Sequence, residues 1–261
     1  ELAHEFRYRD PIVNEKTLIV ALSQSGETMD TLMAVRHARE QGAKVISICN
    51  THGSTLPRES DAALYTHAGP EIAVASTKAF LAQITAAYLL GLYLAQLRGN
   101  KYKDEIASIL AELQNMPAKI QKVIDNDTQV KELGVEMKDA SSVIFLGRHV
   151  GFPVAMEGAL KLKEITYIHA EGFAAGELKH GPIALIDEGQ PVIVVVPSAN
   201  GRDSLHGKVV SNIQEVRARG AFTIVIAEEG DEAVKPYADR LITVPACPSL
   251  LQPLLATVPL Q

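Results

Sequence analysis

The chain has 261 residues, of which 47% are hydrophobic and 21% charged, a composition typical of a globular protein with one large domain or two ordinary ones. Its formal net charge of −6 excludes a general basic field that would attract nucleic acid or an anionic membrane surface, so an anion would have to be bound locally. The two cysteines, Cys49 and Cys247, have no CxxC or metal-ligand spacing, which argues against a disulfide framework and a zinc site and fits a reducing cytoplasm.

The first part of the chain predicts a strand–helix–strand unit. Residues 17–22 (TLIVAL) form a continuous apolar run, the pattern of a strand covered on both faces. Residues 28–41 then show helical spacing of apolar side chains and are followed by Gly42 at a C-cap position. Residues 44–49 predict the next strand, which ends in a buried structural thiol at Cys49. Short connections between these elements indicate a βαβ unit and a parallel sheet.

Residues 79–95 are apolar enough to raise the question of a membrane span. Gln83 and Thr85 interrupt the apolar run, and Gln96 follows it. We therefore expect a helix from about residue 77 to 97 that is buried inside a protein and does not cross a bilayer.

The second part of the chain repeats this pattern. A strand is predicted at residues 191–196, and a turn rich in Ser, Asn and Gly follows from Ser198 to Ser204. A helix then runs from about residue 205 to 219, and residues 222–227 predict a further strand. The segments that come next also correspond in the two copies, at residues 59–66 and 237–244. The repeat indicates two copies of one α/β fold.

We place the first copy at residues 1–100, an amphipathic and charged helical connector at 101–131, and the second copy at 132–261. The second copy begins with a strand at 143–146 and a helix at about 152–167, for which the first copy has no equivalent. The first copy ends in the long apolar helix, whereas the chain stops early in the corresponding helix of the second. We therefore expect both copies to be truncated at the chain ends.

A turn rich in hydroxyl groups joins the first predicted strand to its helix: Ser23-Gln24-Ser25-Gly26-Glu27-Thr28. A helix start supplies unpaired amides and a positive dipole end, and hydroxyl groups can surround phosphate oxygens. The alternative is that Thr28 only caps the helix and that the serines are turn residues. Three hydroxyls in six residues after a parallel strand favour a phosphate site. The turn of the second copy has a poorer pattern, so we predict one phosphate site only.

One predicted helix carries Glu157, Lys161 and Glu164 at positions i, i+4 and i+7, so the three side chains share a face. For a generic helix, an exposed salt-bridged face is the ordinary explanation. Here the other side of the helix is small and apolar, and the helix runs directly into a further polar motif. A carboxylate beside an ammonium group can serve there as a base for proton transfer.

That further motif is residues 168–182, IHAEGFAAGELKHGP, in which two histidines, two acids and a lysine lie among Gly and Ala. Gly and Ala cannot fill a core, and they suit backbone that approaches a ligand closely. The spacing is not that of a metal site, and we predict neither a metal nor a cofactor. His180 is the acid–base candidate near neutral pH, whereas His169 is expected to make structural hydrogen bonds.

Three motifs, SQSGET, GPEIAVASTKAF and EGALKLKEITYIHAEGFAAGELKHGP, resemble the isomerase domain of the glutamine–fructose-6-phosphate aminotransferase (glucosamine-6-phosphate synthase) family over essentially the whole chain. The resemblance implies an α/β fold of two tandem SIS (sugar isomerase) domains, each a flavodoxin-like αβα sandwich with a parallel sheet. It also implies a cytoplasmic enzyme that converts fructose 6-phosphate, as its imine, to glucosamine 6-phosphate by ring opening and 1,2-proton transfer. Ammonia would come from a glutaminase domain of the same full-length chain.

The resemblance further implies roles for single residues. Glu164 would move the proton between C1 and C2 with Lys161 beside it, and His180 would open the sugar ring from a neighbouring subunit, which implies a homodimer. The hexose 6-phosphate would be held by a phosphate-binding turn and a sugar-binding loop, made of Ser23, Gln24, Ser25, Thr28, Val74, Ala75 and Ser76. Because the glutaminase domain, an opening strand and a lysine-bearing tail of the family lie outside this sequence, we expect the chain alone to be inactive.

Two other functions fit part of the pattern. A SIS-type deglycase, or another enzyme of amino-sugar phosphates, would use the same turn and carboxylate, but the HAEGFAAGELKHGP segment is closer to the synthase. A non-catalytic sugar-phosphate sensor would need the turn and no acid–base set. Glu164, Lys161 and His180 together favour an enzyme, which the fold alone would not have decided. We expect no nucleic-acid partner and no membrane partner.

Overall fold

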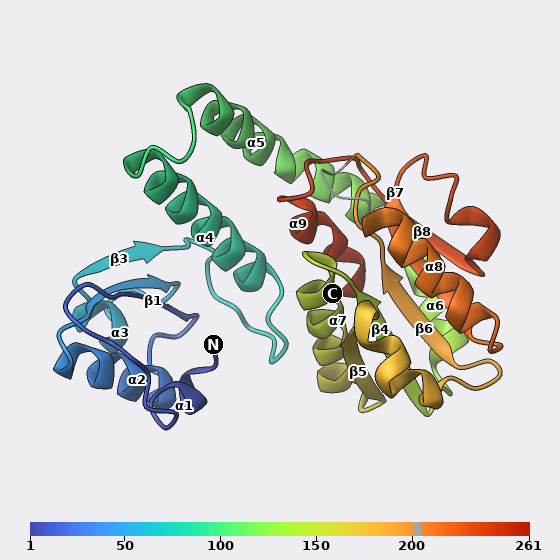
Figure 1. Ribbon diagram of the computed structural model, residues 1–261, viewed down its shortest axis with the longest axis horizontal. Coiled ribbons are helices and arrows are strands. Elements are labelled where there is room, and N and C mark those ends of the chain that lie inside the picture. The colour runs from blue at the N-terminus through green and yellow to red at the C-terminus, as the bar shows by residue number, and fades with distance from the viewer. Residues whose placement is uncertain (201–204) are drawn as a thin grey trace. The chain divides into compact units, whose positions relative to one another are not determined.

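The computed structural model describes residues 1–200 and 205–261, so Ser204, at the end of the turn predicted in the second copy, lies outside the described residues. The chain divides into two compact units, residues 1–106 and 107–261, and each contains one parallel sheet (Figure 1). This arrangement confirms the predicted α/β fold class.

The first unit has three strands in the order β1-β2-β3 (Figure 1). Helix α2 packs on one face of the sheet, where its Leu32 and Val35 join Ala21, Val45 and Leu56 in a small core. The elements are α1 (Ala3–Phe6), β1 (Leu18–Ser23), α2 (Met29–Glu40), β2 (Lys44–Cys49), α3 (Thr55–Arg58), β3 (Ala62–Tyr65) and α4 (Lys78–Leu97).

Strand β1 is less covered than its sequence predicts. Leu18, Val20 and Leu22 are 42%, 36% and 48% exposed, so the prediction that both faces are buried is wrong for this strand. The reason is that side chains alternate along a strand, and α2 covers only the face that carries Ile19 and Ala21. In addition, β1 is an edge strand of its sheet.

Helix α4 is also more exposed than expected. Of its 20 residues only Ala79, Leu90 and Leu92 are buried, so the expectation of a helix buried in the protein is wrong for the chain as it stands. A helix of this length spans about 30 Å, whereas three strands cover only about 10–15 Å. By length and composition alone, α4 is long and apolar enough to cross a membrane. The core helices of soluble proteins also meet these two criteria.

The second unit has five parallel strands in the order β5-β4-β6-β7-β8. Its core lies between the sheet and α8 and includes fully buried Val192, Val209, Ile213 and Val225. The strands are β4 (Ser142–Gly147), β5 (His169–Ala174), β6 (Pro191–Val195), β7 (Phe222–Glu228) and β8 (Arg240–Val244). Helix α5 (Lys103–Asp125) begins in the first unit and lies mostly in the second. The other helices of the second unit are α6 (Thr128–Met137), α7 (Gly151–Thr166), α8 (Leu205–Arg217) and α9 (Gln252–Ala256), with 3₁₀ turns at η1 (Ala175–His180), η2 (Pro182–Leu185), η3 (Lys235–Tyr237) and η4 (Val258–Leu260). The predicted connector is thus helical, and Met116 and Val123 of α5 are buried.

The two units repeat one another in detail. The order β1-β2-β3 matches β6-β7-β8, and all of these strands are parallel. Asp61 exchanges two hydrogen bonds with Val45, from its backbone N–H to the Val45 carbonyl (2.9 Å) and from the Val45 N–H to its carboxylate (2.9 Å). Asp239 makes the same pair with Thr223, at 2.9 and 2.8 Å. These equivalent bonds align residue 45 with residue 223 and confirm the repeat.

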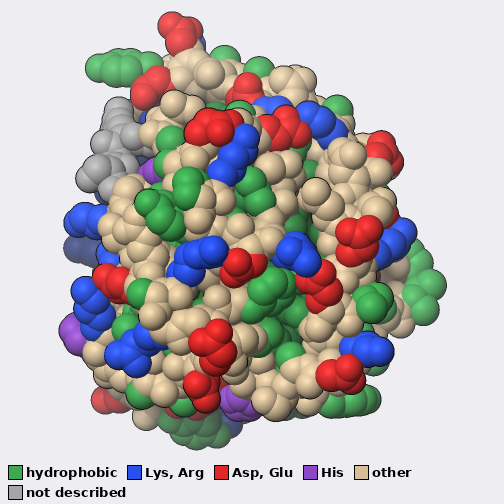
Figure 2. Space-filling view, turned by 90° about the vertical axis from the view of Figure 1, so that its right-hand side faces the viewer, with side chains coloured by type: hydrophobic (Ala, Val, Ile, Leu, Met, Phe, Trp, Pro, Cys, Tyr) green, Lys and Arg blue, Asp and Glu red, His purple; other side chains and the backbone are tan. Residues whose placement is uncertain are grey.

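The face of the molecule shown in Figure 2 carries no broad field of one sign. On the face shown in Figure 2, basic and acidic side chains alternate, with hydrophobic side chains between them. An anion must therefore be recognised by local groups, as the net charge of −6 predicts.

Candidate functional site

The turn between β1 and α2 presents its hydroxyl groups for donation. The Gly26 N–H donates to Ser23 Oγ at 3.0 Å, and the Glu27 N–H donates to Ser25 Oγ at 3.2 Å. Because each hydroxyl accepts in these bonds, its own hydrogen remains available to an oxygen of a ligand. Thr28 is the N-cap residue of α2 but makes no side-chain cap bond. The turn thus lies at a helix start with hydroxyl hydrogens that its internal bonds do not use.

The loop after β2 fixes the shape of this turn. The Gln24 carbonyl accepts bonds from the N–H groups of Asn50 and Thr51, both at 3.2 Å. Gly26 has φ of 69°, and a Cβ at this position would overlap the Ser54 hydroxyl and lie 2.8 Å from the sulfur of Cys49. Only glycine fits such a left-handed and crowded position. Cys49 itself is fully buried, which confirms the prediction of a structural thiol.

The second predicted binding segment of the first unit is the loop before α4. Val74 is 96% exposed, Ala75 is buried and Ser76 is half-buried. The Glu71 carboxylate accepts a bond from the Ala79 N–H at 2.9 Å and from the Thr77 N–H at 3.3 Å. Glu71 thereby caps α4 and closes the loop.

In the second unit, α7 carries a cluster of three charged side chains, in which Lys161 is buried, Glu157 half-buried and Glu164 exposed. Lys161 is only 4% exposed, and its Nζ lies 2.8 Å from Glu164 Oε2 and 3.4 Å from Glu157 Oε1. Burial raises the pKa of Glu157, against the opposing effect of the Lys161 charge, and the Glu164 charge raises that pKa further. An exposed salt-bridged face is thus excluded for Lys161 and Glu157.

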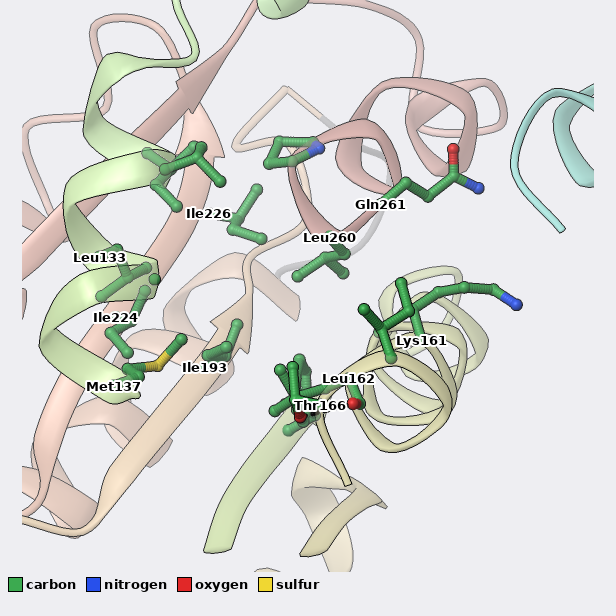
Figure 3. Close-up of a pocket in the computed structure, with 17 residues that line it drawn as sticks. Leu133, Met137, Lys161, Leu162, Thr166, Ile193, Ile224, Ile226, Leu260 and Gln261 are labelled. Atoms are coloured by element: carbon green, nitrogen blue, oxygen red, sulfur yellow. Dashed lines mark hydrogen bonds between the residues drawn. The ribbon is translucent and has the colours of Figure 1, made fainter. Parts of the chain in front are cut away.

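The Lys161 side chain separates this cluster from an apolar cavity. Its stem, with Leu162 and Thr166 of α7, lines a cavity of about 210 Å³ whose other walls come from α6, the sheet and Leu260. The ammonium group points away from the aliphatic side chains of the cavity (Figure 3). The charged groups of α7 therefore lie on the side of Lys161 that faces away from the cavity.

His180 lies at the end of η1 on the surface of the second unit. Its Nδ1 is 2.8 Å from Glu177 Oε2, and the two side chains are 71% and 66% exposed. An imidazole held by a carboxylate has a fixed ring orientation and can exchange protons. His169, on β5, lies 3.6 Å from Glu171 and is 67% exposed.

The structure brings some of the predicted residues together and leaves others apart. Ser23, Gln24, Ser25 and Thr28 form one turn, and Lys161 contacts Glu164 directly. The turn and the loop belong to the first unit, whereas the α7 cluster and His180 belong to the second. Within the described ranges 1–200 and 205–261, no group of three or more His, Cys, Asp or Glu is placed to hold a metal ion.

Comparison with known proteins decides the family. The SIS domain family matches residues 1–93 and 136–261. The chain belongs to the SIS domain family. It is 79% identical to a glutamine–fructose-6-phosphate aminotransferase [isomerizing] of Corynebacterium glutamicum and 68% identical to that of Streptomyces coelicolor. Both alignments cover 100% of this chain and 42% of the relative, so the chain spans less than half of their length.

A solved SIS structure agrees with the sequence match. The C-terminal domain of glucosamine-fructose-6-phosphate aminotransferase from Francisella tularensis superposes with a TM-score of 0.93 at 43% identity. The match covers 100% of this chain and 73% of that one. The chain therefore corresponds to the isomerase (SIS) region of these aminotransferases, which are enzymes.

Two acidic residues of the first unit have contacts that the sequence did not indicate, and a third was placed only on the shared face of α7. Glu27 binds the start of α3 from within the turn, Glu71 closes the loop before α4, and Glu157 shares the ammonium of Lys161. The spacing of Glu157 four residues before Lys161 is a usable signal in sequence. Glu27 and Glu71 bond to backbone N–H groups, and a sequence pattern contains no information about such long-range bonds.

Proposed function

We propose that this chain is the sugar-phosphate isomerase part of a glutamine–fructose-6-phosphate aminotransferase that works in the cytoplasm. Its substrate would be fructose 6-phosphate, and its product the aldose glucosamine 6-phosphate. Ammonia would come from a glutaminase domain of the same full-length chain. The observation that carries this proposal is the 79% identity along the whole chain to such an enzyme, with the anion turn and the α7 charge cluster inside the aligned region.

The proposal assigns the phosphate group to the turn at Ser23, Gln24, Ser25 and Thr28. Support comes from the hydroxyl hydrogens of Ser23 and Ser25, which the two internal bonds leave available. The first turn of α2 adds unpaired N–H groups and the positive end of the helix dipole. The loop of Val74, Ala75 and Ser76 would hold the sugar, by contacts from its backbone and from the Ser76 hydroxyl.

In the proposed chemical step, the Glu164 carboxylate takes a proton from C1 of the open-chain imine and returns it to C2. The electrons of the broken C1–H bond form a C1=C2 double bond while the C2=N π electrons take a proton at nitrogen, which gives an enediol-type species with an amine at C2. Protonation at C2 and loss of the O1 hydroxyl proton to solvent then leave the amino aldose. The Lys161 ammonium, 2.8 Å from Glu164 Oε2, supports this role because its charge stabilises the carboxylate and nearby developing negative charge. Glu157 balances the buried ammonium.

His180 would open the sugar ring, and a neighbouring copy of the chain would supply it, so the active protein would be a homodimer. The exposure of the imidazole, 71%, leaves it accessible to a second subunit. Its bond to Glu177 Oε2 orients the ring for proton transfer to the ring oxygen.

The decisive experiment follows exchange of the C1 and C2 protons of hexose 6-phosphate with D₂O by NMR, in the intact protein. Glu164→Gln should reduce the exchange rate by at least about a hundredfold, the ordinary contribution of general base catalysis. Glu232→Gln, which alters an exposed ion pair with Lys235, is the control and should exchange at the unchanged rate. Normal exchange in Glu164→Gln would reject Glu164 as the base.

A further inference from the structure

We propose that Glu27 is a positioning residue, whose carboxylate fixes the phosphate turn by accepting a hydrogen bond from the backbone N–H of Thr55. The inference rests on the proposed function, because it concerns the same phosphate-binding turn. It adds a residue that binds no ligand atom and acts through the turn.

Two consecutive residues of the turn are bonded to the start of α3. Glu27 Oε1 accepts from the Thr55 N–H at 2.7 Å, and the Gly26 carbonyl accepts from the Leu56 N–H at 2.9 Å. The bond to Thr55 is charge-assisted, the stronger kind of hydrogen bond. The hydrogen bonds from Thr55 lower the pKa of Glu27, and Arg58 lowers it further against the opposing charge of Glu59, so the acceptor stays ionised at neutral pH.

The direction of this carboxylate matters because Glu27 is the only acidic residue in the segment 23–28. A carboxylate free to turn toward the binding hydroxyls would repel a dianionic phosphate. Its bond to Thr55 N–H holds it at α3 instead. A negative residue can thus belong to an anion turn without facing the anion.

Glu27 also controls the hydroxyl groups on either side of it. Its backbone N–H donates to Ser25 Oγ at 3.2 Å, so a shift of Glu27 reorients the Ser25 hydroxyl. Thr28 follows directly as the N-cap residue of α2. The other end of the turn is held separately, through the Gln24 carbonyl and the N–H groups of Asn50 and Thr51. Without the Glu27 carboxylate, the α3 side keeps only the Gly26–Leu56 bond.

The same hydrogen bond can be removed from its donor side. Thr55 is the first residue of α3, a position where proline is favoured in helices. The preceding Ser54 has φ of −68° and ψ of 169°, the extended conformation required before a proline. Thr55→Pro therefore deletes the N–H without a backbone clash. Thr55→Ala keeps the N–H and removes only the hydroxyl, which accepts a bond from Arg58 at 3.1 Å and also lowers the pKa of Glu27, so it separates the share of the hydroxyl from that of the N–H.

The test measures KM and kcat for fructose 6-phosphate in the intact protein. Glu27→Ala and Thr55→Pro should each raise KM about tenfold, with kcat changed less than about twofold, as expected for the loss of one charge-assisted bond that shapes the binding turn. The double variant should be no worse than either single variant, because both remove the same bond. Glu27→Gln should restore the KM of the wild type or lower it, since the amide oxygen accepts the same bond and carries no charge. The exposed Glu40→Ala should match the wild type, and Thr55→Ala should raise KM less than Thr55→Pro because it keeps the N–H.

Several results would overturn the inference. A wild-type KM in Glu27→Ala, an additive double variant, or a Glu27→Gln as weak as Glu27→Ala would each reject the positioning role. A fall in kcat at unchanged KM would do the same. Failure of the proposed function is separate, because it appears in the wild type as equal binding of fructose 6-phosphate and unphosphorylated fructose by calorimetry. Circular dichroism melts show that each variant is folded, and if Glu27→Ala does not fold, a wild-type KM in Thr55→Pro rejects the inference instead.

Discussion

Removal of the Lys161 charge offers the sharpest test of the Lys161–Glu157 pair on α7, whose side chains are 4% and 11% exposed. At the 3.4 Å separation between Lys161 Nζ and Glu157 Oε1, an effective dielectric constant of about 20 gives an attraction of about 5 kcal/mol, most of which offsets the cost of removing both charges from water. Loss of one partner from a buried pair typically costs about 3–5 kcal/mol, because the other charge remains without compensation. We therefore expect Lys161→Met to lower the free energy of unfolding by about 3 kcal/mol at neutral pH.

The loss of unfolding free energy in Lys161→Met should depend on pH, and Glu157 determines whether it grows or shrinks as the pH rises. Burial already raises the pKa of Glu157 in the folded protein, and loss of the Lys161 charge removes the main effect that opposes this rise. A carboxyl group with a raised folded pKa binds its proton more tightly in the folded state than in the unfolded state. The contribution of this carboxyl group to the free energy of unfolding is fully present below the unfolded pKa of about 4.3. It is lost, by about 1.4 kcal/mol per pH unit, as the pH rises to the folded pKa.

The assay is urea unfolding of the chain, followed by circular dichroism at several pH values from 5 to 8. Lys161→Met should lie closest to the wild type at pH 5 and move away from it as the pH rises. Lys161→Met combined with Glu157→Gln should remove most of that pH dependence, and the exposed Lys163→Met should resemble the wild type throughout. A cost of Lys161→Met that is the same at pH 5 and pH 8 would refute the reasoning.

Two further predictions concern the turn and the thiols. Gly26→Ala should weaken binding of hexose 6-phosphate more than tenfold in titration calorimetry, because Ala costs about 1–2 kcal/mol at φ of 69° and its Cβ would overlap Ser54. The control is Gly99→Ala, at φ of 67° with open space around it. Equal binding by the two variants would contradict the argument. Burial, with the nearby Glu228 charge, raises the pKa of the Cys247 thiol to about 12, and Cys49 is fully buried. Neither thiol of the folded chain should therefore react with iodoacetamide at pH 8 as fast as it reacts in urea. Mass spectrometry measures the alkylation, and rapid alkylation of Cys247 without urea would contradict the prediction.

Much of the fold follows from local pattern. The apolar runs, helical periodicity and C-cap glycines predict β1, α2 and β2, and the same pattern predicts their second copies. Gly42 and Gly220 have φ of 90° and 86°, the left-handed conformation that makes glycine the usual residue after a helix. The phosphate turn was predictable for a similar reason, because its hydroxyls and glycine lie within six consecutive residues.

Other parts depend on tertiary contacts that no local pattern contains. Strand β5 (HAEGFA) has little apolar alternation and a glycine, so the sequence does not predict a strand there. It forms because it pairs with β4 from His169 to Ala174, and because Gly172 lets it approach α7, where a Cβ would lie 2.7 Å from Met156 Cα. Likewise, spacing places Lys161 between two carboxylates but cannot show that the ammonium is buried.

The repeat also explains why one copy of the fold should bind an anion and the other should not. The bonds of Asp61 and Asp239 align residue 45 with residue 223, so Asn50 of the first copy corresponds to Glu228 of the second. At that place in the second copy, Glu228 is 8% exposed and its carboxylate accepts a bond from the Ser198 hydroxyl at 2.9 Å.

The Ser198 hydroxyl therefore donates its hydrogen to Glu228 and does not offer it to an anion. The buried negative charge of Glu228 also repels a phosphate group. We expect titration calorimetry of the wild type with fructose 6-phosphate to give one site per chain, and Ser198→Ala to leave both the stoichiometry and the affinity unchanged. Ser25→Ala with Thr28→Ala should abolish most of the binding. A stoichiometry of two, or a loss of binding in Ser198→Ala, would show that the second copy has kept an anion site despite its internal carboxylate.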